Sequence, residues 1–517
     1  MIKDKILWVD DEIDILRPYI IFLEEKNYEV LTATNGQDAI DLCKQNHFDV
    51  IFLDENMPGK SGLETLSLIK EIDPSVPVVM ITKNEAENLM DMAIGNKIAD
   101  YLIKPVNPNQ ILLALKKNVH KREIINELTT SGYRSDFNKI GMQINDSLTY
   151  QDWIDVYRRL VYWELELSEN ENEMDELLLM QKAEANSAFA KFIKRNYQKW
   201  FDQPDTRPLI SPDLFKKKVF PILDQGEKIF FILIDNFRFD QWRLIRNILS
   251  EFYSFDEEAI YYSILPTATQ YARNAIFSGL MPLQIEQMFP DLWISEEEDE
   301  SKNMNEEELI KTQIHRFRKN YTFSFHKIFD TEAGQKLVDK LSQYTNNQLN
   351  VVILNFVDML SHARTESKMI RELAHSEEAY RSLTLSWFRH SSTYELFKTL
   401  ANENYKVMVT TDHGTIQVNN PIKVVGDRNT SVNLRYKMGK NLNYNPKEVF
   451  EMTHPATFGL PSSNVSSSYI FCTKDDFFAY PNNYNYYVNY YKNTFQHGGV
   501  SLQEMLIPFI TMTPKKK

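Results

Sequence analysis

The stretch Tyr405–Gly414, YKVMVTTDHG, is a short run of mostly apolar, strand-forming residues that ends in an acidic residue, a histidine and a glycine. Such a run is typical of a buried strand, and the glycine permits a tight turn directly after it. Two other runs have the same form: KIFFILID ends in Asp235, and NVVILNFVD ends in Asp358. We therefore predict an α/β domain over residues 207–517 whose strands end in polar residues at one edge of the sheet.

Metal-ligand residue types occur at these strand ends. His362 follows Asp358 by four residues, on the same face if a helix begins there. Asp412 and His413 are adjacent, and His497 lies in the loop FQHGG. Together with Asp235 these residues suit two Zn²⁺ ions, because imidazole and carboxylate are ordinary zinc ligands. Two neighbouring metal ions stabilise the attacking and leaving oxygens of a displacement at phosphorus.

A candidate nucleophile lies in Leu265–Gly279, LPTATQYARNAIFSG. We expect a helix that begins at the threonines and stops at Gly279, and a helix start favours an anion. A threonine hydroxyl beside a metal ion becomes a usable nucleophile. Each of these segments has an ordinary interpretation on its own, as a helix cap, a turn or a surface histidine. Their occurrence together, each after an apolar strand, favours a phosphate site.

Residues 1–120 alternate short apolar runs with amphipathic stretches, which predicts a parallel sheet with helices on both faces. Three of the runs end in Asp10 and Asp11, in Asp54 and in Thr82, and Lys104 follows another. Clustered carboxylates suit Mg²⁺, while the lysine and the threonine hydroxyl suit a phosphoryl group. The pattern predicts an aspartate that becomes phosphorylated.

The set DD…DxNMPG…T…KP resembles the receiver domain of bacterial response regulators. The resemblance implies a flavodoxin-like fold over residues 1–120, phosphorylation of Asp54 and a sensor histidine kinase as partner. It assigns the remaining roles as follows: Mg²⁺ binding to Asp10, Asp11, Asp54 and Asn56, and switching to Thr82, Tyr101 and Lys104.

The order D…T…DxxxH…DHG…HG resembles the alkaline phosphatase superfamily, with the spacing of its nucleotide pyrophosphatase/phosphodiesterase branch. That resemblance implies an α/β sandwich in which Thr269, and not Thr267, is the nucleophile. It implies two zinc ions with these ligands: Asp235, Thr269, Asp412 and His413 for one, and Asp358, His362 and His497 for the other.

One position departs from that branch. Ala272 stands where the branch has a phosphate-contacting Asn, so Arg273 or Asn274 is a candidate replacement. Arg428 and Arg435, in the basic stretch at 423–440, are further candidate phosphate contacts if that stretch covers the cleft. A solvated hairpin explains the stretch equally well.

Residues 121–206 are expected to form a helical bundle, because their apolar residues recur three and four apart. The whole chain is expected to have an α/β multidomain fold, and its layout resembles that of PorX-type response regulators, whose C-terminal half is called PglZ-like. This resemblance implies regulation of type IX protein secretion. It also implies a secretion-system component or a sigma factor as a partner, while the receiver resemblance implies a homodimer promoted by phosphorylation.

Two functions follow. The first is a phosphorylation-regulated, zinc-dependent phosphodiesterase or phosphatase, acting on a nucleotide or oligonucleotide. The second is a zinc-stabilised interaction module that binds secretion or transcription components without catalysis. A formal charge of −14 and the lack of a helix-turn-helix motif argue against a dedicated DNA-binding protein. Two distant cysteines, no signal peptide and no apolar run of membrane-spanning length indicate the cytoplasm.

Overall fold

The computed structural model describes residues 4–73, 76–83, 98–118, 121–146, 149–168, 174–295, 303–427, 430–462, 464 and 466–515. The chain divides into two compact units, Met1–Gly132 and Tyr133–Lys517, and each is considered by itself.

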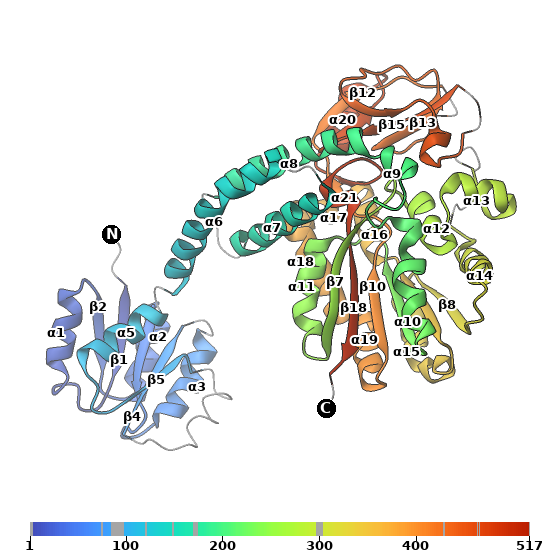
Figure 1. The fold of residues 1–517 in the computed structure, drawn as a ribbon. Coiled ribbons are helices and arrows are strands. Elements are labelled where there is room, and N and C mark those ends of the chain that lie inside the picture. The colour runs from blue at the N-terminus through green and yellow to red at the C-terminus, as the bar shows by residue number, and fades with distance from the viewer. Residues whose placement is uncertain are drawn as a thin grey trace. The chain divides into compact units, whose positions relative to one another are not determined.

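The first unit contains a parallel five-stranded sheet with the order β2-β1-β3-β4-β5. Its strands are β1 (Lys5–Val9), β2 (Glu29–Ala33), β3 (Val50–Asp54), β4 (Val78–Thr82) and β5 (Asp100–Ile103). The helices around it are α1 (Arg17–Glu25), α2 (Gly36–Gln45), α3 (Gly62–Ile72) and α5 (Pro108–Asn118) (Figure 1). This is the flavodoxin-like strand order, so the predicted fold class is confirmed.

Successive residues of β1 explain why helices cover both faces of this sheet. Leu7 and Val9 belong to a core that includes residues of α2 and α3, whereas Ile6 and Trp8 belong to a second core with residues of α1 and α5. Because side chains alternate across a strand, a run that is apolar at every position requires cover on both sides.

The second unit begins with helices that are continuous with its main core. They are α6 (Lys121–Asp146), which crosses from the first unit, α7 (Tyr150–Ser168), α8 (Asp175–Asn196) and α9 (Lys199–Asp202). Trp153 of α7 and Phe189 of α8 are buried in the same cluster as Tyr262 of the large sheet, and the rings of Phe189 and Tyr262 stack at 6.3 Å. Within the helical bundle predicted at 121–206, helices α7 and α8 therefore share a core with the C-terminal domain.

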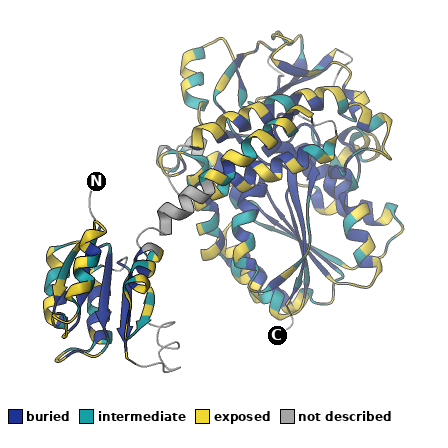
Figure 2. Ribbon diagram, turned by 60° about the vertical axis from the view of Figure 1, so that its left-hand side comes forward, coloured by how far each residue is buried: buried dark blue, intermediate teal, exposed yellow. Residues whose placement is uncertain are grey.

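The large sheet of the second unit has the order β7-β18-β10-β6-β9-β8. Its strands are β6 (Ile229–Ile234), β7 (Tyr253–Tyr262), β8 (Phe323–Ile328), β9 (Leu349–Leu354), β10 (Lys406–Thr410) and β18 (Leu506–Pro514). Strands β10, β6, β9 and β8 are parallel, and β18 runs antiparallel to both β10 and β7. Every residue of β6 and β9 is buried (Figure 2). Because β10, β6 and β9 are parallel neighbours, their carboxyl ends lie side by side.

Helices and small sheets complete the second unit, and the strands of the small sheets come between β10 and β18 in the chain. The helices are α10 (Phe220–Asp224), α11 (Phe239–Leu249), α12 (Thr269–Ser278), α13 (Pro282–Met288), α14 (Glu306–Arg316), α15 (Thr331–Asp339), α16 (Phe356–Glu366), α17 (Lys368–Leu373), α18 (Glu377–His390), α19 (Ser392–Asn402), α20 (Tyr484–Tyr491) and α21 (Leu502–Met505). The small sheets pair β11 (Ile416–Gln417) with β17 (Phe495–Gln496), β12 (Asn420–Lys423) with β16 (Asp476–Ala479), and β15 (Ser467–Cys472) with both β13 (Tyr436–Lys440) and β14 (Val449–Met452).

Helix α12 begins and ends as its sequence predicts. Thr269 is its first residue, after an extended Ala268. Gly279 ends it with φ +65°, and the Gly279 amide donates a hydrogen bond to the carbonyl of Ala275. Glycine suits this left-handed position because it has no Cβ.

Candidate metal centre and nucleophile

Three of the predicted ligands lie at the carboxyl edge of the large sheet because of where the strands end. Asp235 directly follows β6, and Asp412 comes two residues after β10. Asp358 lies in the first turn of α16, directly after β9. Since these strands are parallel neighbours, residues 235, 358 and 412 meet at one edge.

His497 reaches this edge through the pairing of β11 with β17. The register places Ile416 opposite Gln496, which brings the segment of His497 alongside the segment of His413. The two imidazole rings stack with centroids 4.2 Å apart. Gly414 directly follows His413 in the turn after β10, and a Cβ at this position would lie 2.0 Å from the carbonyl oxygen of Gln503. Only glycine allows that approach.

The first group of potential ligands is Asp235, Asp412 and His413, all buried, with ligand atoms within 4.8 Å of one another. Nε2 of His413 lies 3.9 Å from a carboxylate oxygen of each aspartate. The hydroxyl Oγ1 of Thr269 lies 3.0 Å from the same nitrogen. The structure thus brings the predicted nucleophile together with the three side chains predicted to share its zinc ion.

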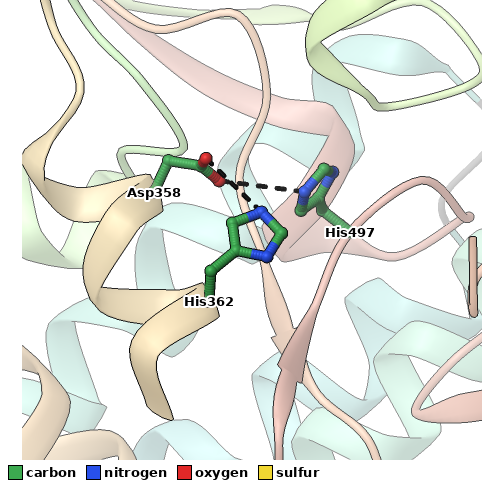
Figure 3. A group of neighbouring side chains, drawn as sticks. All are labelled: Asp358, His362 and His497. Atoms are coloured by element: carbon green, nitrogen blue, oxygen red, sulfur yellow. Dashed lines mark ion pairs between the residues drawn. The ribbon is translucent and has the colours of Figure 1, made fainter. Parts of the chain in front are cut away.

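The second group is Asp358, His362 and His497 (Figure 3). Asp358 and His362 project from the same face of α16, with 3.5 Å between carboxylate and Nε2, and Nε2 of His497 approaches the carboxylate to 3.8 Å. The side chain of His362 is 61% exposed, whereas that of His497 is 13% exposed. This group therefore forms the solvent-facing side of the centre.

Backbone carbonyls orient the rings of His413, which is buried, and of His497, which is partly exposed. Nδ1 of His413 lies 3.1 Å from the carbonyl of Gly414, and Nδ1 of His497 lies 3.2 Å from that of Thr267. A carbonyl can only accept, so each Nδ1 carries a proton, and Nε2 is the nitrogen that a metal ion would use. Burial, with His413 and His362 nearby, holds the pKa of His497 well below its usual value. Neutral, oriented imidazoles are the form that binds metal ions.

The donor set fits zinc. Each group offers carboxylate oxygen and imidazole nitrogen within reach of one ion. Oδ1 of Asp235 is buried and has no hydrogen-bond partner, which is costly unless a cation compensates it.

Arg273 takes a different role from the predicted substrate contact. It is 1% exposed, and its guanidinium lies against the carboxylates of Asp235 and Asp412, with 2.9 Å from Nε to Asp412. NH1 lies 3.7 Å from the carboxylate of buried Glu306. Burial alone would raise the pKa of Asp412, but the charge of Arg273 lowers this pKa to about 2. Arg273 is therefore the charge partner of the first group.

The other candidate phosphate contacts are Asn274, Arg428 and Arg435. Asn274 is buried at 3% exposure, beside the fully buried Ala272. Arg435 is also fully buried and pairs with Glu504 at 2.6 Å, so the structure contradicts its predicted position in a loop over the cleft. Arg428 lies outside the described residues.

Asn236 is a functional candidate that the sequence analysis missed. Its backbone is left-handed, with φ 60°, and its amide N–H donates to Asp412 at 3.4 Å. Its side-chain Nδ2 donates to Asp358 at 3.2 Å and to Ser361 at 3.1 Å. Asn236 therefore contacts one carboxylate of each group. The available signal was an asparagine directly after a strand, because asparagine tolerates the left-handed conformation.

The receiver cluster lies at the carboxyl edge of the first sheet. Asp10, Asp11 and Asp54 have carboxylate oxygens within 4.8 Å of one another, a donor set that fits a hard cation such as Mg²⁺. Lys104 Nζ lies 2.8 Å from Asp10 and 2.9 Å from Asp54. Burial raises the pKa of Asp54, and Lys104 opposes that rise.

The other predicted receiver residues are close by in sequence or at the same edge. Thr82 is buried and donates its hydroxyl hydrogen to the carboxylate of Glu55. Asn56 is exposed two residues after Asp54, and Tyr101 is 45% exposed on β5. The exposed tyrosine is thus outside the core of the first unit.

Comparison with known families agrees with this architecture. Residues 6–116 match the response regulator receiver domain, residues 123–201 the PorX response regulator linker domain, and residues 214–512 the BREX system PglZ alkaline phosphatase-like domain. The chain belongs to the PglZ family. Its three matched parts are those of a PorX-type response regulator, as the sequence predicts.

Individual relatives of this PglZ-family regulator match through the receiver. AlgB of Pseudomonas syringae, an alginate biosynthesis transcriptional regulatory protein, is 37% identical over 122 residues, which is 24% of this chain and 27% of that protein. ResD of Bacillus subtilis, a transcriptional regulatory protein, is 37% identical over 22% of this chain and 47% of its own length. The chain thus spans less than half of either relative.

Among solved structures, chemotaxis protein CheY4 of Vibrio cholerae is 29% identical and covers 23% of this chain and 99% of its own, with a TM-score of 0.22. A receiver domain protein from Clostridium thermocellum is 30% identical over 23% of this chain and 98% of its own, also with a TM-score of 0.22.

Within the described part of the chain, no helix combines the length and apolar character needed to cross a membrane.

Proposed function

We propose that the PglZ domain hydrolyses phosphodiesters with Thr269 as the nucleophile and with a zinc ion at each of the two ligand groups. The observation that carries this proposal is the position of Thr269. Its hydroxyl lies at the first residue of α12, 3.0 Å from Nε2 of His413, beside three buried metal-ligand side chains.

The chain supplies the parts of an in-line displacement. Oγ1 of Thr269 loses its proton and bonds to phosphorus, while the bond from phosphorus to the leaving ester oxygen breaks and that oxygen takes up a proton. Water then cleaves the phosphothreonine ester, which releases a phosphomonoester and restores Thr269. The N-terminal end of α12 favours the negative phosphoryl oxygens. Bound zinc would lower the pKa of the hydroxyl and stabilise charge on oxygen.

A nucleotide-type diester, including an oligonucleotide, is the proposed substrate class. The support is the PTxT run around Thr269 and its resemblance to the nucleotide phosphodiesterase branch. A phosphomonoester is the competing substrate, and the experiment below separates the two.

We propose that the receiver controls this activity. A sensor histidine kinase would supply the phosphoryl group to Asp54, with Mg²⁺ held by Asp10, Asp11, Asp54 and Asn56. Lys104 already contacts two of these carboxylates and is placed to pair with the added phosphoryl charge. The PorX-type layout supports a role in regulating type IX secretion.

The test compares hydrolysis of bis-p-nitrophenyl phosphate and of p-nitrophenyl phosphate by the zinc-loaded full chain. Thr269→Val has nearly the same shape without the hydroxyl, and Thr269→Ser keeps a hydroxyl. We expect diester turnover to fall at least a hundredfold in Thr269→Val and to persist in Thr269→Ser, with zinc content unchanged in both.

Equal diester turnover in wild type and Thr269→Val would contradict the assignment of the nucleophile. No turnover of either ester by the zinc-loaded wild type would favour the alternative function, in which zinc stabilises a surface that binds secretion or transcription components. Faster turnover of the monoester than of the diester would mean that phosphomonoesters, and not phosphodiesters, are the substrate class.

A further inference from the structure

Arg238 is a buried charged residue that the proposed reaction does not use. It lies three residues after Asp235, at the start of α11, and is 1% exposed. Its Nε donates to Asp240 at 2.9 Å, and its NH1 forms an ion pair with Glu377 at 2.5 Å. A buried guanidinium with two carboxylate partners is held firmly in place.

On one side, Arg238 contacts the segments that carry the second ligand group. Its guanidinium lies 5.7 Å from the ring centroid of Tyr380 and 5.6 Å from that of Phe495, and these rings stack at 4.2 Å. Phe495 precedes His497 by two residues. The hydroxyl of Tyr380 donates to the carbonyl of Val357, the residue directly before Asp358, at 3.2 Å. Arg238 therefore supports the backbone on both sides of the second group.

On the other side, charge pairs lead from Arg238 to the linker helices. Oδ2 of Asp240 contacts NH1 of Arg381 at 3.3 Å, and the same nitrogen donates to Glu164 of α7 at 2.6 Å. Glu164 also pairs with Lys182 of α8 at 2.8 Å. Glu164 and Lys182 lie within residues 123–201, the part that matches the PorX linker domain. The series of contacts is thus continuous from the linker to the second group.

This set of six residues, the linker relay, is balanced in charge. It has three cations and three carboxylates: Lys182, Arg238, Arg381, Glu164, Asp240 and Glu377. All six side chains are at most 21% exposed. Because an unpaired buried charge is costly, removing or displacing one member forces its neighbours to move.

We propose that the linker relay couples helices α7 and α8 to the second ligand group, so that the linker sets the geometry and zinc affinity of Asp358, His362 and His497. This inference rests on the metal centre of the proposed function. Arg238 and Arg381 act as positioning residues: Arg238 lies against Phe495 in the segment that carries His497, and Arg381 connects Asp240 to Glu164 of the linker. The relay gives the linker a direct route for regulating the catalytic site.

The test measures zinc binding by the metal-free full chain against a chromophoric chelator. The variant is Glu164→Gln, which removes the linker charge nearest Arg381. The matched control is Asp213→Asn, because Asp213 is 14% exposed and pairs with Arg207 at 2.9 Å outside the relay. We expect the dissociation constant of the second ion to rise at least tenfold in Glu164→Gln, with that of the first ion changed less than twofold. In Asp213→Asn both constants should stay within twofold.

A readout independent of affinity is the visible absorption spectrum of Co²⁺ bound at the second site, which reports ligand geometry. The absorption maxima should shift in Glu164→Gln, whereas the spectrum of Asp213→Asn should match that of wild type. Lys182→Met, at the outer end of the relay, provides a second variant should Glu164→Gln fail to fold, and a smaller change in the same direction is expected.

Unchanged second-site affinity in Glu164→Gln, or equal weakening at both sites, would overturn the relay. Wild type that binds two ions without hydrolysing diesters would overturn the proposed activity. The zinc affinities of the variants would still decide whether the linker relay exists. Wild type that binds fewer than two ions would overturn both the metal centre and the relay.

Discussion

Asp235 has a buried carboxylate oxygen, Oδ1, without a hydrogen-bond partner, while Arg273 contacts the other oxygen. The same guanidinium serves Asp412 and approaches Glu306. One arginine thus compensates a cluster of buried carboxylates at the place where a zinc ion is proposed. Its charge and that of the ion are expected to act in the same direction on the stability of the domain.

Replacing Arg273 tests that relation. We expect Arg273→Met to lower the stability of the metal-free chain by about 3–5 kcal/mol, because it leaves buried carboxylates unpaired. Saturating Zn²⁺ should restore much of the loss, since the ion supplies positive charge at the same carboxylates. Thermal unfolding midpoints with a chelator and with Zn²⁺ give the comparison. An equal loss under both conditions would show that the arginine and the metal do not share a site.

Asp476 offers a pH-dependent test. Burial raises its pKa to about 6, although Arg435 and Lys474 oppose the rise. A carboxyl with a raised folded pKa binds its proton more tightly when folded, so its contribution to stability is lost as the pH rises from about 4 to about 6. We expect Asp476→Asn to be more stable than wild type by about 1–3 kcal/mol at pH 7.5, and by less at pH 4.5.

Unfolding curves at the two pH values measure that difference. Asp475→Asn, which removes a negative charge from the neighbouring residue, is the control and should show a smaller pH dependence. A gain from Asp476→Asn of the same size at both pH values would mean that ionisation of Asp476 is not its cause.

At the scale of elements, the turn after β10 decides whether His413 and His497 stack. Gly414→Ala would place a Cβ 2.0 Å from the Gln503 carbonyl, which is backbone and cannot rotate away. We expect a loss of at least about 2 kcal/mol and weaker zinc binding, because the turn must shift with His413. Chemical unfolding and zinc titration measure the two effects.

Gly141→Ala is the control for that substitution. Gly141 lies inside α6, and a Cβ there would be 4.0 Å from its nearest neighbour. Alanine should stabilise this helix by about 0.5–1 kcal/mol. Similar effects of the two substitutions would contradict the assigned role of the close approach at Gly414.

Elements whose signals are local could be predicted from the sequence. The apolar runs before Asp235, Asp358 and Asp412 form strands β6, β9 and β10, and α12 has the predicted start and stop. The carboxyl ends of parallel strands lie at one edge of a sheet whatever the strand order, so the two ligand groups could be predicted without knowledge of side-chain packing.

Side-chain partners at long range could not be predicted. Arg273 turns back to Asp412, 139 positions away, and Arg435 pairs with Glu504, 69 positions away. The sequence suggested both arginines as phosphate contacts, because arginine can bind either a substrate phosphate or a buried carboxylate. Only the packing of the folded chain distinguishes these two roles. Periodicity likewise shows that a helix has an apolar face but not what covers it, so the core that α7 and α8 share with the large sheet could not be predicted.

At the scale of the whole molecule, the receiver and the PglZ domain are joined through helices that belong to the core of the second unit. Phosphorylation of Asp54 is expected to promote homodimer formation, as the receiver resemblance predicts. With acetyl phosphate and Mg²⁺, light scattering should show wild type moving toward twice the chain mass of 60.8 kDa. Asp54→Ala should remain at the mass of one chain, and equal dimer formation by the variant would contradict a role for Asp54.

The proposed reaction requires two zinc ions at the carboxyl edge of the large sheet, one at each ligand group. Anomalous X-ray diffraction at the zinc edge, from crystals of the zinc-loaded full chain, tests it most directly. We predict two anomalous peaks, one among Asp235, Asp412 and His413 and one among Asp358, His362 and His497. Bound zinc with no peak at either group would contradict the account.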